Sequence, residues 1–159
     1  QLGFDKEALQ YLGEDGVWLK IPEASAAEVR LEIAKAVRGL DFVADAFTSD
    51  ELAGPTDPAR PFHAEYQRSY YAGRSPDIQM RFKQWHLVDA QTRGTSHGSP
   101  YEYDTHVPVL FFGAGVQPGI QKQRVGTTDV APTLAELLGL TAPAGTDGRS
   151  LARVVRGPR

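Results

Sequence analysis

One histidine of this chain lies in a setting where side chains often do chemistry. His97 sits between Ser96 and Gly98 in a polar loop that begins at Gly94. The two glycines let the backbone turn tightly and leave the imidazole little shielded. The loop leads into an apolar segment, and loops that feed a buried strand commonly carry ligand-binding groups. His97 could therefore ligate a metal ion, act as a base or bond a nearby carbonyl, and its spacing alone does not choose among these roles.

Asp104 and His106 follow closely and suggest a carboxylate–imidazole pair. Residues two apart on a strand face the same side, but at the start of a buried strand we interpret both as structural caps. His63 and His86 are interpreted as ordinary surface or packing residues. The tyrosines are expected to pack rather than to bind substrate: Tyr66, Tyr70, Tyr71, Tyr101 and Tyr103.

Composition bounds the class of protein. The chain has 159 residues, 41% of them hydrophobic, which suffices for one domain with a real core. A net charge of −3 gives no basic footprint for nucleic acid, and the apolar runs are too short to cross a membrane. No cysteine is present, which excludes disulfides and thiolate chemistry. The chain begins at Gln1 and its only methionine is Met80, so we expect an excised part of a longer protein.

The first half of the chain predicts a leader over 1–16 and a small α/β subdomain over 17–88. The expected order is strand, helix, strand, helix, strand. Capping-box spacing at Ser25 and again at Thr48 predicts helix starts, and Gly39 predicts a helix end. The last strand alternates apolar and polar residues, which indicates one buried and one wet face. The expected strands are 17–21, 42–47 and 77–83, and a further helix is expected over 63–71.

Residues 94–151 predict a second region, with the boundary at 89–93. Its segment 107–112 is too short for an ordinary helix and predicts a strand buried on both faces. A helix should start close to Asp129, because Pro132 is tolerated only in a first turn. The apolar stripe of that helix is expected to comprise Leu134, Leu137 and Leu138. The basic tail 152–159 is expected to fray.

Three blocks carry a family resemblance: GTSHGSPYEYDTHVPVLFFGAGV from Gly94, TTDVAPTLAELLGL from Thr127 and DGRSL from Asp147. In this order they resemble the C-terminal part of the alkaline phosphatase superfamily, on the branch of PafA-like phosphatases and type I phosphodiesterases/nucleotide pyrophosphatases. The match is dense over 94–151 and looser over 16–88. The resemblance implies an α/β fold, in which a small α/β subdomain precedes the C-terminal part of an alkaline-phosphatase-like core.

The resemblance also implies chemistry. In this family the histidine of the loop is a ligand of one of two catalytic zinc ions, so His97 is the expected metal ligand. The nucleophile and the remaining ligands lie upstream in the family, and neither an Asp-His pair nor a D-x-x-x-H occurs here. We therefore expect no catalytic residue in this segment. The full-length protein would hydrolyse phosphate esters through a phosphoenzyme, and the segment alone would be inactive.

Other interpretations stay open. A sulfatase-like activity lies within the same superfamily, and a non-catalytic α/β binding module is the rival from another class. A small complete hydrolase using His97 with Asp104 ranks last, because it lacks a positioned nucleophile. The resemblance implies a phosphate-ester substrate and a periplasmic or secreted location. If upstream strands are missing, the apolar segment 107–112 loses its neighbours, and the part 94–151 is expected to be covered by self-association or held in a non-native arrangement.

Overall fold

The computed structural model describes residues 8–13, 16–88 and 93–156, and its fold is mixed α/β with a small antiparallel sheet. The chain divides into a first unit, Gln1–His106, and a second unit, Val107–Arg159. The division lies later than the boundary at 89–93 that the sequence predicts, because the residues after the histidine loop pack on the first unit. Within the described residues no helix is both long and apolar enough to span a bilayer.

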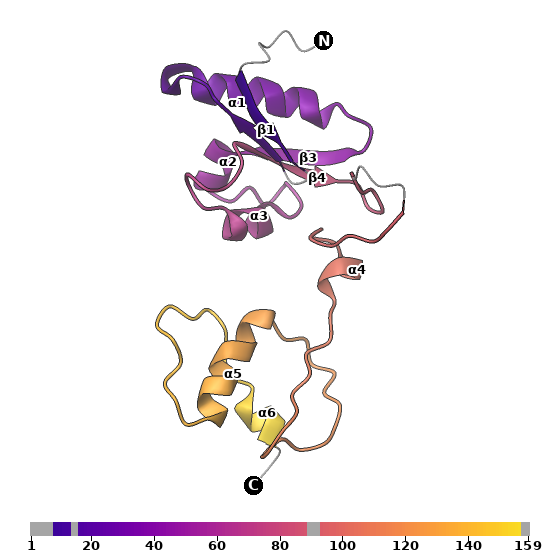
Figure 1. The fold of residues 1–159 in the computed structure, drawn as a ribbon, viewed down its shortest axis with the longest axis vertical. Helices are drawn as coiled ribbons and strands as arrows, with labels where there is room; N and C mark the ends of the chain where they lie inside the picture. The colour runs from indigo at the N-terminus through magenta and orange to yellow at the C-terminus, as the bar shows by residue number, and fades with distance from the viewer. Residues whose placement is uncertain (1–7, 14–15, 89–92, 157–159) are drawn as a thin grey trace. The chain divides into compact units, whose positions relative to one another are not determined.

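A four-stranded sheet in the order β1-β2-β4-β3 forms the first unit (Figure 1). All neighbouring strands are antiparallel. The strands are β1 Leu9–Leu12, β2 Gly16–Leu19, β3 Val43–Thr48 and β4 Ile78–Phe82. The expected strands at 17–21, 42–47 and 77–83 are thus confirmed with small shifts of their ends. Part of the expected leader, β1, belongs to the sheet, and residues 1–7 lie outside the described residues.

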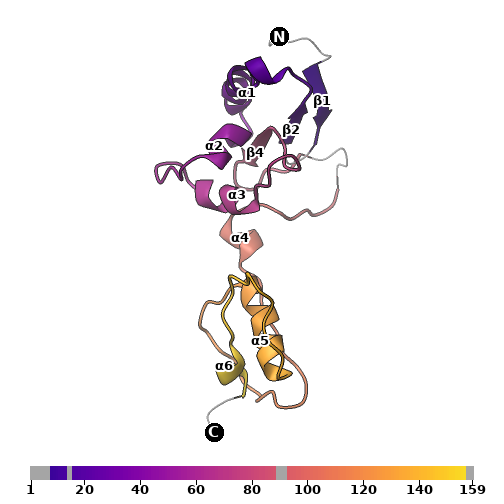
Figure 2. The ribbon, with the colours of Figure 1, turned by 90° about the vertical axis from the view of Figure 1, so that its left-hand side faces the viewer.

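Helix α1, Glu23–Arg38, covers one face of the sheet (Figure 2). Its apolar stripe packs on strand residues in one core: Val17, Ile33, Ala34, Val37, Val43, Ala46 and Ile78. The helix begins after Pro22 and has no side-chain cap, so the capping box expected at Ser25 is wrong. Ser25 lies inside the first turn, where its hydroxyl donates to the Pro22 carbonyl at 3.3 Å. The helix ends before Gly39, as expected.

Helices α2, Ser49–Ala53, and α3, His63–Ser69, lie on the other side of the sheet (Figure 1). The capping box at Thr48 and Glu51 is confirmed, with the Thr48 hydroxyl accepting from the Glu51 amide and the Glu51 carboxylate accepting from the Thr48 amide. Because these helices cover the sheet, Gln79 and Arg81 are each only 8% exposed. The wet face expected for the last strand is therefore wrong.

A cluster of charged side chains sits beside β3 on this covered face. Arg60 donates to Asp45 at 2.7 Å and to Glu51 at 2.7 Å, and its guanidinium lies 4.4 Å from the centre of the Phe47 ring. Arg38 also pairs with both carboxylates. Burial by itself raises the pKa of Asp45, but the hydrogen bonds from Arg60 and from the Ala46 amide outweigh it and hold that pKa below its usual value.

The second unit is built around helix α5, Val130–Leu137, which follows a 3-10 turn, η2, at Thr127–Asp129. The Asp129 carboxylate accepts from the Gly126 amide at 3.0 Å and from the Arg149 amide at 2.8 Å. The Thr133 hydroxyl donates to the Asp129 carbonyl and accepts from the Leu151 amide. A Cβ on Gly148 would overlap the Thr128 carbonyl. The backbone at Gly148 therefore lies in close contact with the 3-10 turn η2.

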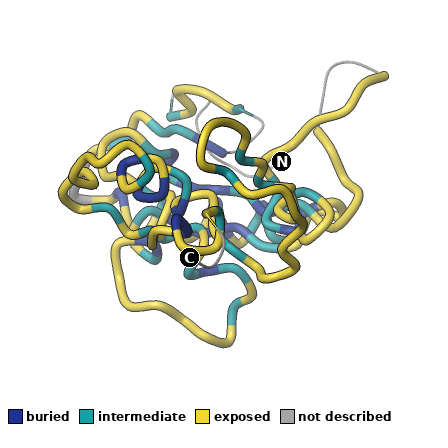
Figure 3. Tube along the Cα trace, turned by 90° about the horizontal axis from the view of Figure 1, so that it is seen from below, coloured by how far each residue is buried: buried dark blue, intermediate teal, exposed yellow. Residues whose placement is uncertain are grey.

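Three expectations for this second unit are corrected. Residues 107–112 form no strand, because the described residues of the unit provide no strand to pair with, and Leu110 is 84% exposed. Helix α5 buries Pro132, Thr133 and Ala135, whereas Leu134 and Leu138 of the expected stripe are exposed. The tail expected to fray contains helix α6, Ala152–Arg156, because Leu151 and Ala152 are buried. In this unit residues 107–128 are all exposed or intermediate. Figure 3 marks the exposed parts of the described chain in yellow and the buried parts in dark blue.

Acid is expected to destabilise the first unit through Asp45 and Glu51. For Glu51, burial raises the pKa, but the Thr48 amide and the charges of Arg60 and Arg38 lower it overall. A pKa lowered by folding adds stability above the unfolded value, and that stability is lost as pH falls through the folded value. The free energy of unfolding, measured in urea, should fall between ~pH 5 and ~pH 3. Arg60→Gln should flatten this dependence.

Arg68→Gln is the matched control, because Arg68 pairs with Glu65 on the exposed surface at 3.3 Å. Exposed pairs contribute little to stability, so this variant should keep the pH slope of the unsubstituted chain. An Arg60→Gln variant with the same slope would show that another group causes the acid sensitivity.

Candidate functional site

The loop that carries His97 is exposed and depends on two glycines. Gly94 has φ 141° and Gly98 has φ 106°, both in a region that other residues rarely adopt. A Cβ at either position would meet no atom within 4 Å, so the need for glycine comes from the backbone angle and not from lack of space. His97 is itself exposed. The imidazole is thus available to a partner outside the unit's core.

Asp104 fixes the end of this loop. Its carboxylate accepts from the Ser99 amide at 2.6 Å. This bond is the main reason that the pKa of Asp104 lies below its usual value, and the Gly98 amide and the His97 imidazole add smaller effects. Asp104 thus has a structural role, but not the expected one at the start of a buried strand, because residues 107–112 form no strand. His106 follows helix α4, Glu102–Thr105, as its C-cap, with its amide donating to the Glu102 carbonyl.

Tyr101 anchors the loop on the sheet. Its side chain is 7% exposed, and its hydroxyl donates to the Phe82 carbonyl at 2.6 Å. The same hydroxyl accepts from Arg81 Nη1 at 3.2 Å. The Phe62 ring meets the Tyr101 ring edge-on, with centroids 5.4 Å apart. Tyr101 therefore packs, as the sequence predicts, and it ties the loop to β4.

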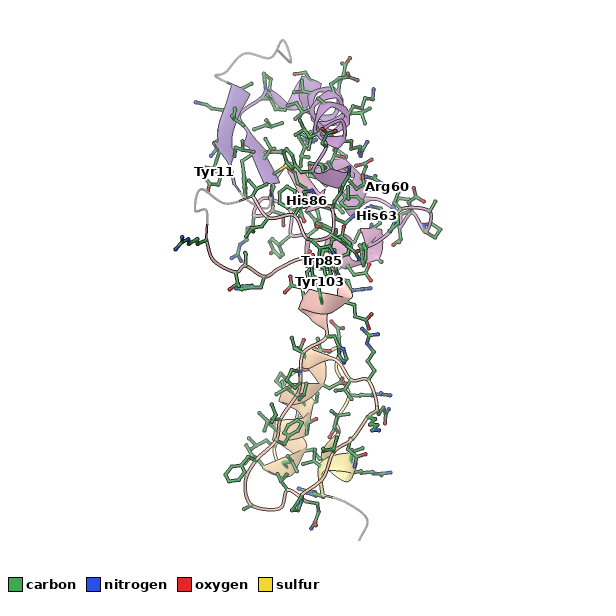
Figure 4. All side chains as sticks on the ribbon, turned by 90° about the vertical axis from the view of Figure 1, so that its right-hand side faces the viewer. Tyr11, Arg60, His63, Trp85, His86 and Tyr103 are labelled. Atoms are coloured by element: carbon green, nitrogen blue, oxygen red, sulfur yellow. The ribbon has the colours of Figure 1, made fainter. Side chains whose placement is uncertain are left out.

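A second aromatic contact lies beside the first. Tyr103 stacks on Trp85 with ring centroids 4.1 Å apart, and its hydroxyl accepts from the Trp85 amide at 3.3 Å (Figure 4). His86 is exposed, and its Nδ1 lies 2.9 Å from the Gln84 carbonyl. Nothing in these contacts brings His86 to the His97 loop.

One histidine of the first unit, His63, is buried. His63 is 3% exposed, stacks on Phe47 at 5.3 Å, and its Nδ1 accepts from the Asp57 amide at 2.8 Å. Tyr66 also packs on Phe47, with ring centroids 4.8 Å apart, and burial raises the pKa of its hydroxyl to about 12. Both side chains have packing roles, in agreement with their interpretation from sequence.

Sequence reasoning missed Arg81 and Phe62. Arg81 reads as a solvated position of an alternating strand, and Phe62 as an ordinary residue before a helix. Both residues contact Tyr101, which lies far from them in the sequence, so no local pattern indicated these contacts.

The donor set of the described residues tests how far a metal fits. No group of three or more His, Cys, Asp or Glu side chains in this part of the chain could hold a metal ion. The imidazole of His97 has the chemistry of a zinc ligand, but zinc needs three or four ligands. The Asp104 carboxylate is already engaged by backbone amides. The described residues thus do not form a complete metal centre by themselves.

Comparisons with known proteins give several relatives, although no family model matches. The chain is 30% identical over 136 residues to a "Calcium-transporting ATPase" of Myroides odoratus. The aligned residues cover 85% of the chain and 24% of that protein. It is 33% identical over 108 residues to alkaline phosphatase PafA of Elizabethkingia meningoseptica, covering 68% of the chain and 20% of that protein. Alkaline phosphatase PhoK of a Sphingomonas species is 33% identical, covering 80% of the chain and 25% of PhoK.

Solved structures and a sulfatase extend this picture. The crystal structure of wild-type alkaline phosphatase PafA matches 94% of the chain and 29% of its own length, with a TM-score of 0.81 and 26% identity. A "Delta 4,5-hexuronate-2-O-sulfatase" of Bacteroides thetaiotaomicron is 39% identical over 71 residues, or 41% of the chain and 14% of that protein. The chain spans about a quarter of the length of the curated relatives that match most of it.

Replacing Gly98 by alanine is expected to cost about 1 kcal/mol or more of unfolding free energy, because a Cβ is strained at φ 106°. Gly54→Ala is the control, since Gly54 has φ −88° and its Cβ would make only ordinary contacts. Urea unfolding of both variants measures the difference. An unchanged midpoint for Gly98→Ala would mean that the loop adopts another backbone at no cost.

Proposed function

The chain belongs to the alkaline phosphatase superfamily, among its PafA-like members, and from this premise we propose that it forms the C-terminal part of a metal-dependent phosphate-ester hydrolase. The similarity to phosphatases and sulfatases makes hydrolysis of an ester of an oxyacid the coarse activity of its relatives. The observation that carries the proposal for this chain is the exposed imidazole of His97 on a loop that Asp104 and Tyr101 fix.

The proposed metal is zinc, and His97 is the proposed ligand from this chain. In the proposed enzyme two zinc ions would neutralise charge on the phosphoryl group and on the leaving oxygen. The nucleophile, the phosphoenzyme that it forms and the other ligands belong, in this proposal, to residues outside those described here. In this proposal the chain contributes one imidazole on a loop that Asp104 and Tyr101 hold.

Two substrate classes follow from the relatives. A phosphate ester, a monoester or a diester, is the first, because PafA and PhoK are named alkaline phosphatases. A sulfate ester is the second candidate, favoured by the similarity to the hexuronate sulfatase. A periplasmic or secreted location is proposed on the family resemblance alone.

The test is a protein of the relatives' length that contains this chain. His97→Ala should lower zinc-dependent hydrolysis of an aryl phosphate about 100-fold or more, since loss even of a group that supports a ligand costs 10–100-fold. His86→Ala is the matched control, because His86 is also an exposed histidine of the first unit. Zinc content is measured alongside, and parallel assays with a phosphate diester and an aryl sulfate identify the substrate class.

The chain alone provides the second arm of this test. One imidazole without partners should not retain zinc against buffer, and no aryl phosphate should be hydrolysed. Stoichiometric zinc in the chain alone, lost in His97→Ala, would contradict the proposal that the other ligands lie elsewhere. Full activity of His97→Ala in the longer protein would overturn the role of His97.

Self-association of the chain alone is also proposed. In the second unit, Leu110 is 84% exposed and Phe112 is fully exposed, and both lie in a segment that forms neither helix nor strand. Large exposed apolar patches normally mark surfaces that contact another protein. Further exposed apolar residues of the unit are Val107, Ile120, Leu134, Leu138 and Leu140.

Phe112→Ser should therefore weaken the association of the chain alone. Sedimentation at several concentrations should show larger species for the unsubstituted chain and smaller ones for the variant. Tyr71→Ser is the control, because Tyr71 is a 66% exposed aromatic residue of the first unit. A monomeric unsubstituted chain at every concentration would refute self-association.

A further inference from the structure

Two residues of the first unit hold costly backbone conformations. Phe62 has φ 68° and Trp85 has φ 65°, and among the residues that the structure describes no other non-glycine residue has a positive φ. Bulky side chains rarely adopt this region, and residues that persist there are often part of a functional site. The question is therefore what these two residues hold in place.

Both rings pack on the tyrosines that follow the His97 loop. Phe62 meets Tyr101 edge-on, with ring centroids 5.4 Å apart. Trp85 stacks on Tyr103 with centroids 4.1 Å apart, and Figure 4 labels this second pair. Tyr101 and Tyr103 stack on each other at 5.7 Å, so the four rings form one continuous group. We call Phe62, Tyr101, Tyr103 and Trp85 the aromatic clamp.

Arg81 adds a second cost at the same place. It is 8% exposed, and its Nε has no hydrogen-bond partner among the described residues. Its guanidinium lies 5.4 Å from the centre of the Phe62 ring, and its Nη1 donates to the Tyr101 hydroxyl. An arginine buried with an unpaired donor lowers stability. Two residues that lower stability thus contact Tyr101: Phe62, through its strained backbone, and Arg81, through its unpaired Nε.

The clamp reaches His97 through a short, constrained stretch of chain. The Tyr101 carbonyl accepts from the Asp104 and Thr105 amides, and the Ser99 amide is held by the Asp104 carboxylate. Pro100, between the two anchored residues, has a fixed φ. Only Gly98 separates the anchored Ser99 from His97, so the position of Tyr101 limits where the backbone of His97 can lie.

We propose that the aromatic clamp and Arg81 are positioning residues that hold the His97 loop in one geometry before any ligand arrives. The inference rests on the proposed function, in which His97 ligates zinc. A ligand that is fixed in advance does not have to be ordered on binding, which raises affinity. In this proposal, Phe62, Trp85 and Arg81 lower the stability of the folded unit, and the gain is a loop that is already ordered for binding.

Tyr101→Phe tests the proposal, with Tyr66→Phe as the matched control. Each substitution removes one hydroxyl that donates to a backbone carbonyl of β4, Phe82 for Tyr101 and Met80 for Tyr66. In the zinc-free chain, Tyr101→Phe should speed amide exchange at Ser99 at least ~10-fold, and Tyr66→Phe should not. In the longer protein, Tyr101→Phe should weaken zinc binding ~10-fold or more, as loss of supporting contacts around a ligand does.

Trp85→Leu is a second variant, chosen because Trp85 is 76% exposed and its loss does not endanger the core. It should speed Ser99 exchange in the same direction as Tyr101→Phe. Unchanged exchange in both variants would overturn the clamp, whether or not zinc binds. If exchange rises as expected but His97→Ala binds zinc normally, the clamp orders the loop and the proposed function fails instead.

Discussion

The pairing of β3 with β4 is the constraint on which the first unit depends. Asp45 lies opposite Arg81 and Phe47 opposite Gln79, so one face of this pair is largely polar. The other face carries small and aliphatic residues under α1. A slip of one residue would exchange the two faces, placing charges under the helix and removing the anchor of Tyr101. The ion pairs of Asp45, the contact of Arg81 with Tyr101 and, through Tyr101, the His97 loop therefore all depend on this polar face.

Much of this architecture is readable from the sequence where the signal is local. The strands around residues 17–83, the capping box at Thr48 and the start of α5 near Asp129 follow from alternation, caps and proline chemistry. The failures are non-local. Arg81 alternates like a solvated residue, but helices and Tyr101 bury it. The segment 107–112 has the composition of a strand, yet a strand exists only where another strand pairs with it.

The candidate site shows the same division. His97 stands out in the sequence because of its glycine-bracketed loop and its family resemblance. Asp104 has a structural role, as expected, but it holds the Ser99 amide and does not cap a strand. The aromatic clamp could not be predicted, because left-handed backbones at Phe62 and Trp85 leave no trace in residue type. Its members come from separate stretches of chain that only the folded sheet brings together. Residues that support a loop from distant parts of the chain are thus harder to recognise from sequence than a residue within the loop.

The hydrogen bonds of Asp129 and Thr133 determine where the second unit can tolerate changes in chain length. The Arg149 and Leu151 amides donate to these two side chains. These bonds hold together the two ends of the loop that follows α5. The cost of closing a loop grows only slowly with its length. Residues 139–147 could therefore be lengthened, shortened or replaced by another module while these bonds stay intact. This loop is the natural place for the chain to accept new sequence without losing α5.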